Sequence, residues 1–123
     1  MAGNPVNWFE IYVQDMPRAK AFYESVLQVS LSQLSPGPPE MWSFPSSMTD
    51  YGTSGSLVRM EGVPSGGNST IVYFHCDDCS VEGARVAPAG GRIMKDKFSI
   101  GEYGFIALGF DTEGNMFGLH SMK

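Results

Sequence analysis

Basic residues are few in this sequence, and they nowhere gather into a cluster. The chain of 123 residues carries 8 Lys and Arg against 13 Asp and Glu, a formal net charge of −5 at pH 7. Nucleic acids and anionic membrane surfaces attract proteins through basic patches, so we expect neither as a partner. Long apolar runs are missing as well, and no stretch approaches the roughly 20 residues that a membrane-spanning helix needs.

The start of the sequence lacks the positive segment and apolar run of a secretory signal peptide, so we expect a cytoplasmic protein. Cysteine is also scarce, and the only two form the motif CDDC at residues 76–79. A structural zinc site would need a second pair of ligands at close spacing, which the sequence does not offer. The motif is therefore either a redox pair or, in our interpretation, buried core at the start of a helix.

What the sequence does have is a hydrophobic fraction of 42%, with 12% aromatic residues, which is enough to form a core. Residues 6–13 alternate between two faces as a strand does. Residues 15–27 have helical spacing of apolar residues, with Asp15 as the N-cap. Shorter strands are expected at 29–34, 41–45 and 55–61.

The same order of elements then restarts. A strand is expected at 69–76, and a helix that a Pro/Gly cluster ends is expected in DDCSVEGARVAPAGG at 77–91. Strands follow in GRIMKDKFS, YGFIALGF and GNMFGLH. The halves align when Asp78 is placed over Asp15, and the first strands then pair Trp8 with Ile71, Glu10 with Tyr73 and Tyr12 with His75. Laying GSLVRME over GNMFGLH pairs Leu57 with Met116, Arg59 with Gly118 and Glu61 with His120.

This repeat predicts an α+β fold of two βαβββ modules, at about residues 5–63 and 68–123, within a single domain of residues 1–123. Connection rules make the first and last strand of each half neighbours that run parallel. Each module is then a curled mixed sheet with a helix on its outer face. The other face is concave, and we expect it to look onto its twin and form a ligand cleft.

Three segments resemble a known family. DMPRAKAFYESVL at 15–27 resembles the D-x-x-R-A-x-x-F-Y-x-x-V-L/F-G segment of the vicinal oxygen chelate superfamily, which includes glyoxalase I, bleomycin-resistance proteins and extradiol dioxygenases. DTEGNMFGLH at 111–120 is similar to the family ending D-P-x-G-N-x-x-E-L. VYFHCDDCSVEGARVAPAGG at 72–91 resembles the second strand-and-helix segment. The similarity spans essentially the whole chain and looks like the short, glyoxalase-related bacterial members.

The resemblance implies a divalent metal held by His and Glu side chains from the first and fourth strands of both halves. In this sequence the four matching positions hold Trp8, Ile71, Arg59 and Gly118. Gly118 stands three residues after Asn115, where the family pattern has a glutamate. A divalent ion needs carboxylate oxygens or neutral imidazole, and the fixed charge of Arg59 would repel it. We therefore expect no metal and no other cofactor.

Other side chains on the expected inner faces are candidates for function. Glu10 and His75 are the candidate catalytic residues, as general bases. Aromatic neighbours would desolvate Glu10 and raise its pKa, and the pKa of a histidine lies near neutrality. The candidate ligand-binding residues are Trp8, Tyr12, Arg59, Tyr73, Met116, Gly118 and His120.

Two alternatives stay open for these residues. Glu10 can form a structural ion pair with Arg59, which would lower its pKa instead. The second alternative is a displaced metal site, one step along each strand from the usual ligand positions. It would be built from Glu10, His75, Glu61 and His120.

The substituted ligand positions and the aromatic cleft predict a protein that binds a small aromatic or oxygenated molecule without metal. The alternative is a lyase or isomerase acting on a small oxygenated substrate, with Glu10 or His75 as the base and with or without the displaced metal site. The resemblance also implies a homodimer.

Overall fold

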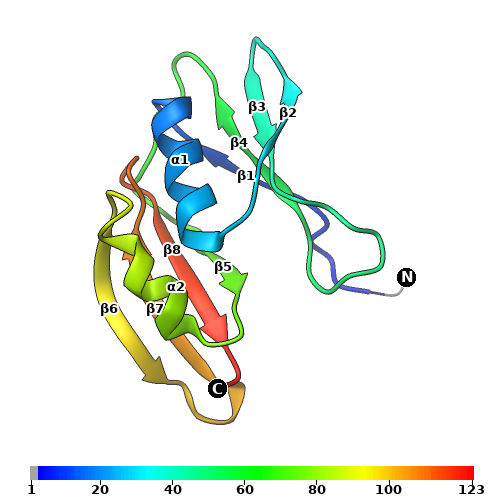
Figure 1. Cartoon of the computed structure of the whole chain (residues 1–123). Helices are drawn as coiled ribbons and strands as arrows, with labels where there is room; N and C mark the ends of the chain where they lie inside the picture. Colours follow the sequence, from blue (N-terminus) through cyan, green and yellow to red (C-terminus); the bar gives the residue numbers. More distant parts are fainter. Residues whose placement is uncertain (1–2) are drawn as a thin grey trace.

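The computed structural model describes residues 3–123 (Figure 1). Module 1, the first repeat, contains β1 (Phe9–Tyr12), α1 (Met16–Leu27), β2 (Ser32–Ser35), β3 (Glu40–Ser43) and β4 (Gly55–Arg59). Module 2, the second repeat, contains β5 (Val72–His75), α2 (Cys79–Val86), β6 (Arg92–Ser99), the 3-10 helix η1 (Gly101–Tyr103), β7 (Phe105–Phe110) and β8 (Met116–Ser121).

Each module forms one four-stranded mixed sheet, and the two sheets share one topology. The strand order is β1-β4-β3-β2 in module 1 and β5-β8-β7-β6 in module 2. In both modules the first and last strands run parallel, and the other neighbours are antiparallel. The predicted α+β fold of two βαβββ modules is confirmed.

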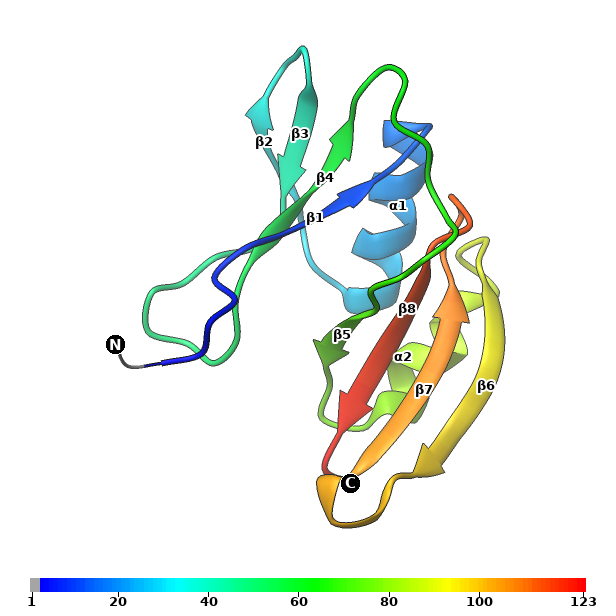
Figure 2. The same ribbon diagram turned by 180° about the vertical axis from the view of Figure 1, so that it is seen from behind.

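Both helices lie on the same side of the molecule, and the opposite face of each sheet carries no helix (Figure 2). We call these two surfaces the helix-free faces. They open to the same side, whereas the sequence led us to expect that each would look onto its twin.

Both helices begin where an aspartate caps them. The Asp15 side chain accepts a hydrogen bond from the Arg18 N–H, and the Asp78 side chain accepts one from the Ser80 N–H. The second helix ends at Val86, at the Pro/Gly cluster that was expected to end it. Ala87 keeps helical backbone angles, but Pro88 has no N–H with which to continue the helical hydrogen bonds. Within residues 3–123, neither helix has the length and apolar character to cross a membrane.

The two modules share one hydrophobic core on the helix side of the sheets. Aromatic rings from both modules meet there: Phe44 of module 1 lies 5.7 Å from Phe74 of module 2, and Tyr23 on α1 lies 5.7 Å from Phe74 and 5.9 Å from Phe117. Such tilted and edge-on pairs stabilise a core beyond the burial of their area. Neither sheet therefore buries its helix side alone.

The hydrogen-bond register corrects the overlay of the closing strands. The Val13 N–H donates to the carbonyl of Val58, and in module 2 the Cys76 N–H donates to the carbonyl of His120. The predicted alignment of the first strands pairs Val13 with Cys76. Their hydrogen-bond partners, Val58 and His120, are therefore counterparts in the closing strands. Two residues earlier, the counterpart of Gly118 is Ser56 and not Arg59.

The turn between β7 and β8, residues 111–115, fastens module 2 to module 1. The buried Glu113 carboxylate accepts hydrogen bonds from the backbone N–H groups of Gln14 and Asp15 at 2.9 and 3.0 Å. It also takes two from the Arg18 guanidinium, at 2.7 and 2.9 Å. Burial opposes ionisation of Glu113, but these hydrogen bonds outweigh it and lower the pKa to about 2.

Two further side chains of the same turn hold module 1. The Tyr23 hydroxyl donates to the Asp111 carboxylate at 2.6 Å inside the core. The Asn115 amide donates to the carbonyl of Tyr12 at 3.0 Å and accepts from the Gly66 N–H at 2.6 Å. Asn115, near the end of the sequence, thus holds Tyr12, the last residue of β1, in place.

Candidate functional site

A cavity of about 560 Å³ lies along the free edge of β1, between the two modules. Residues of β1, the linker at 64–70 and the start of β8 line it. It brings together four of the predicted site residues: Trp8, Glu10, Tyr12 and Met116. We call it the Trp8 cavity.

Strand alternation places Trp8, Glu10 and Tyr12 on one face of β1, because successive side chains point to opposite sides. Ile11 and Val13 take the helix side and are buried. The Tyr12 hydroxyl donates to the Glu10 carboxylate at 3.0 Å. This hydrogen bond, partial burial and the negative charge of Glu10 raise the pKa of Tyr12. Glu10 itself is exposed rather than desolvated between aromatic rings, as the sequence had suggested.

A second cavity of about 620 Å³ adjoins the first and contains two more predicted residues, Tyr73 and His75. We call it the His75 cavity. The two cavities share Val6, Phe9 and Val72 in their linings. The exposed ring of Tyr51, from the loop before β4, lies 5.5 Å from the His75 ring. The two candidate bases, Glu10 and His75, therefore line adjacent cavities rather than one.

Gly118 lines neither cavity, because the space that its side chain would take is already filled. The ring of Tyr73 lies over Gly118, so close that an added Cβ would collide with it. Tyr73 and Gly118 are register partners in the parallel pair of β5 and β8. The absence of a side chain at Gly118 therefore leaves no room for a ligand, because the Tyr73 ring occupies that space.

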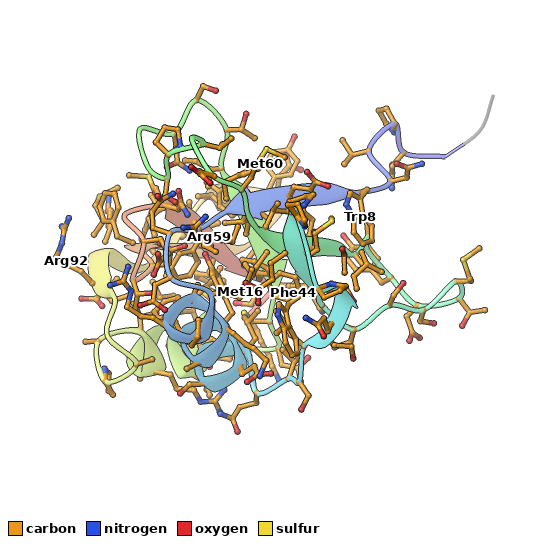
Figure 3. All side chains as sticks on the ribbon, turned by 90° about the horizontal axis from the view of Figure 1, so that it is seen from above. Trp8, Met16, Phe44, Arg59, Met60 and Arg92 are labelled. Carbon is orange, nitrogen blue, oxygen red and sulfur yellow. The ribbon has the colours of Figure 1, made fainter. Side chains whose placement is uncertain are left out.

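Arg59 and His120 make contacts away from both cavities. The Arg59 Nε donates to the carbonyl of Gln14 at 3.1 Å, and Arg59 and Trp8 lie toward opposite ends of β1 (Figure 3). The expected ion pair between Glu10 and Arg59 does not form in the described part of the chain. The Nε2 atom of His120 lies 2.7 Å from the carbonyl oxygen of Tyr103.

Comparison with known proteins identifies the family. A sequence model of the Glyoxalase/Bleomycin resistance protein/Dioxygenase superfamily matches residues 6–119. The chain belongs to this superfamily. No curated protein matches the sequence.

Solved structures share the fold of this chain at low sequence identity. A family enzyme from Burkholderia phytofirmans PsJN has a TM-score of 0.75 at 15% identity, with 95% of this chain and 98% of that chain covered. The hypothetical protein SA1046 from S. aureus has a TM-score of 0.73 at 14% identity, covering 98% and 95%. The V278E mutant of glyoxalase I from Zea mays has a TM-score of 0.74 at 22% identity, covering 96% of this chain but 46% of the maize chain.

The superfamily metal does not fit the residues present. With the corrected register, the four matching positions hold Trp8, Ile71, Ser56 and Gly118. None supplies the carboxylate or imidazole that a divalent ion prefers, although the Ser56 hydroxyl is buried and without a hydrogen-bond partner. The displaced site is not assembled either, because residues 3–123 contain no group of three or more His, Cys, Asp or Glu placed to hold a metal.

The CDDC motif fits the buried-core interpretation. Cys76 and Cys79 are free and buried, and Cys79 begins α2. Burial, followed by the negative charge of Glu82, raises the pKa of the Cys76 thiol to about 12. A thiol in that state is a poor nucleophile, because the reactive form is the thiolate.

The sequence missed the polar linker side of the Trp8 cavity. Asn68 and Thr70 line it opposite β1, and the Asn68 amide is held by hydrogen bonds to the Thr70 and Met116 carbonyls. The glycines and proline of GVPSGGNS, residues 62–69, predict only a flexible loop. The asparagine that follows two glycines, Asn68, is the one sign in the sequence that this loop has a polar role. No local pattern shows that the loop packs beside β1 and lines the cavity.

Proposed function

We propose that this protein binds a small, flat molecule in the Trp8 cavity and does so without the metal chemistry of its superfamily. The observation that carries the proposal is the cavity itself, where Trp8, Tyr12 and Met116 supply apolar surface and Glu10 supplies a polar group. A concave site with aromatic walls and a few polar groups suits a small ligand. The substituted metal positions favour binding over the usual chemistry of the fold.

Nuclear magnetic resonance can test this proposal with an internal control. The chain has two tryptophans, and the Trp42 indole N–H is held by Glu40 at 3.0 Å on the helix side, away from the cavity. We expect aromatic fragments to shift the Trp8 indole signal and to leave the Trp42 signal in place. A fragment set that shifts neither signal contradicts the proposal. So does stoichiometric metal after native purification that is lost in Glu10→Gln or His75→Ala.

A second candidate function is general-base catalysis in a lyase or isomerase. The hydrogen bond between Tyr12 and Glu10 favours it, since it orients a carboxylate at a cavity that could hold a substrate. With a substrate in hand, Glu10→Gln should abolish turnover while leaving binding within a few fold. Unchanged turnover in both Glu10→Gln and His75→Ala would remove both assigned bases.

We also propose that the protein is a cytoplasmic homodimer. Exposed apolar residues on or beside the helix-free faces, among them Trp8, Ile71 and Tyr73, support association. The free cysteines agree with a reducing compartment. Light scattering at micromolar concentration should give twice the chain mass of 13.4 kDa, and a single chain mass would contradict the dimer.

A further inference from the structure

The ionisable groups around the Trp8 cavity are of one sign. Among the described residues that line it, Glu10 is the only acidic side chain, and there is no Lys, Arg or His. The carboxylate is exposed at the cavity and not sealed in the core. An anionic ligand would find no positive partner here, whereas a cation would find a carboxylate.

Glu10 forms no ion pair with any of the residues that the structure describes. The ion pairs of residues 3–123 join Arg18 to Glu113, Lys20 to Glu24 and Lys97 to Asp78. The one hydrogen bond of the Glu10 side chain comes from the Tyr12 hydroxyl and reaches Oε1. Its Oε2 atom remains available to a ligand. Arg59, the ion-pair partner that the sequence suggested, is held at the Gln14 carbonyl instead.

The aromatic rings of the cavity also have no cation over them from the described part of the chain. Elsewhere the chain places its own cations over ring faces: Lys20 over Trp42, Arg92 over Phe110, Lys95 over Phe98 and Lys97 over Phe105. No Lys or Arg within residues 3–123 lies over Trp8 or Tyr12 in this way. Trp8 is 39% exposed, and tryptophan is the ring that attracts cations most strongly.

We propose that the ligand of the Trp8 cavity is a flat organic cation, a ring system that carries an amine or quaternary nitrogen. Its ring would stack on Trp8 and Tyr12, and its positive charge would lie beside the Glu10 carboxylate. This inference rests on the proposed function, since it names the class of ligand for the same cavity. Charge complementarity favours a cationic ligand over a neutral or anionic one. Among the described residues, the Trp8 cavity has a carboxylate without an ion-pair partner and aromatic rings without a cation over them.

Three probes of similar shape and different charge test the proposal: 1-methylquinolinium, neutral quinoline and quinoline-2-carboxylate. Titration of the Trp8 indole signal at pH 8 gives the dissociation constant of each. We expect the cation to bind about tenfold more tightly than the neutral or anionic probe, and this preference to shrink in about 0.5 M salt. Equal affinity of the cation and the anion would overturn the proposal.

Variants locate the effect. Glu10→Gln keeps the size of the side chain, and we expect it to weaken the cation about five- to tenfold and to leave quinoline unchanged. Glu102→Gln makes the same charge change at an exposed position outside the cavity and should alter neither affinity. Trp8→Leu, followed by calorimetry, should weaken all three probes. An unchanged affinity for the cation in Glu10→Gln would contradict the proposal.

The outcomes separate this inference from the proposed function. If quinoline or its carboxylate shifts the Trp8 signal and the cation does not bind more tightly, the cation proposal fails and the binding site stands. If no probe shifts that signal, both fail. If Glu10→Gln changes the oligomeric state and leaves the probe affinity unchanged, Glu10 contacts a second copy rather than the ligand, and the cation proposal is overturned while the binding site stands.

Discussion

On the helix-free face of module 2, the ring of Tyr73 packs directly on Gly118, which has no side chain to keep it away. The ring covers the glycine from the neighbouring strand. The position where the superfamily pattern has a glutamate has therefore become part of the wall of the protein. The Tyr73 ring fills the space that a side chain at this position would take.

Changing Gly118 to alanine should cost little, because Tyr73 can yield. The ring of Tyr73 is 47% exposed and can turn into solvent when a Cβ displaces it. We expect Gly118→Ala to lower the free energy of unfolding by about 1 kcal/mol, measured by urea denaturation. In a Tyr73→Ala background the same change should be neutral or stabilising, since alanine suits a strand better than glycine. Equal costs in both backgrounds would show that Tyr73 is not the obstacle.

The titration of Tyr12 should depend on the charge of Glu10. The pKa of Tyr12 is raised by its hydrogen bond to Glu10, by partial burial and by the Glu10 charge. Glu10→Gln removes the charge and weakens the hydrogen bond, so the pKa of Tyr12 should fall toward its ordinary value. Carbon resonances of labelled tyrosine rings, followed against pH, measure this. An unchanged pKa of Tyr12 in Glu10→Gln would show that Glu10 does not influence Tyr12.

At the scale of elements, the sequence predicts the order of strands and helices and the faces of β1 and β5. Alternation at period two is a local property, and the capping aspartates Asp15 and Asp78 align the halves. The overlay of the closing strands failed because it matched two glycines with different roles. Gly55 lies within β4, where the Phe9 ring leaves no room for a Cβ, whereas Gly114 is a turn residue with φ of 80°.

The sequence does not show what the turn at 111–115 holds. Its pattern predicts a tight turn, which it is. The partners of its side chains stand far away in the sequence, since 95 residues separate Arg18 from Glu113. Long-range contacts of this kind leave no local periodicity. For the same reason, the sequence named Trp8, Glu10 and Tyr12 on one face but could not separate them from His75, which lines a neighbouring cavity.

Glu113→Gln should destabilise the protein most at neutral pH. The pKa of Glu113 is about 2 in the folded state, against an ordinary value of 4.5. Its contribution is present above pH 4.5 and is lost as the pH falls through about 2. We expect Glu113→Gln to cost about 2 to 3 kcal/mol at pH 7, measured by urea denaturation.

The pH profile is the control for this prediction. Between pH 4.5 and about 2 the wild type should lose stability faster than Glu113→Gln, because only the wild type protonates this carboxylate. Glu102→Gln, at an exposed position, should leave both the stability at pH 7 and the profile unchanged within about 0.5 kcal/mol. Parallel pH profiles for the wild type and Glu113→Gln would contradict the assignment.

At the scale of the whole molecule, the shared core predicts that the modules fold together. Phe44 and Tyr23 of module 1 pack on Phe74 of module 2, so either half alone would expose a cluster of rings. We expect fragments 5–63 and 68–123 to lack dispersed proton spectra when made separately. The full chain should unfold in one transition by both fluorescence and circular dichroism. A well-dispersed spectrum from either fragment would show that a module is an independent domain.

The contacts of Glu113 also constrain how the protein can be made. A growing polypeptide folds its first-made parts first when they are complete in themselves. Here the carboxylate that satisfies the N–H groups of Gln14 and Asp15 is added 98 residues after Asp15. The first module must therefore leave the ribosome unfinished, and its final structure forms only after the turn of the second module has been synthesised.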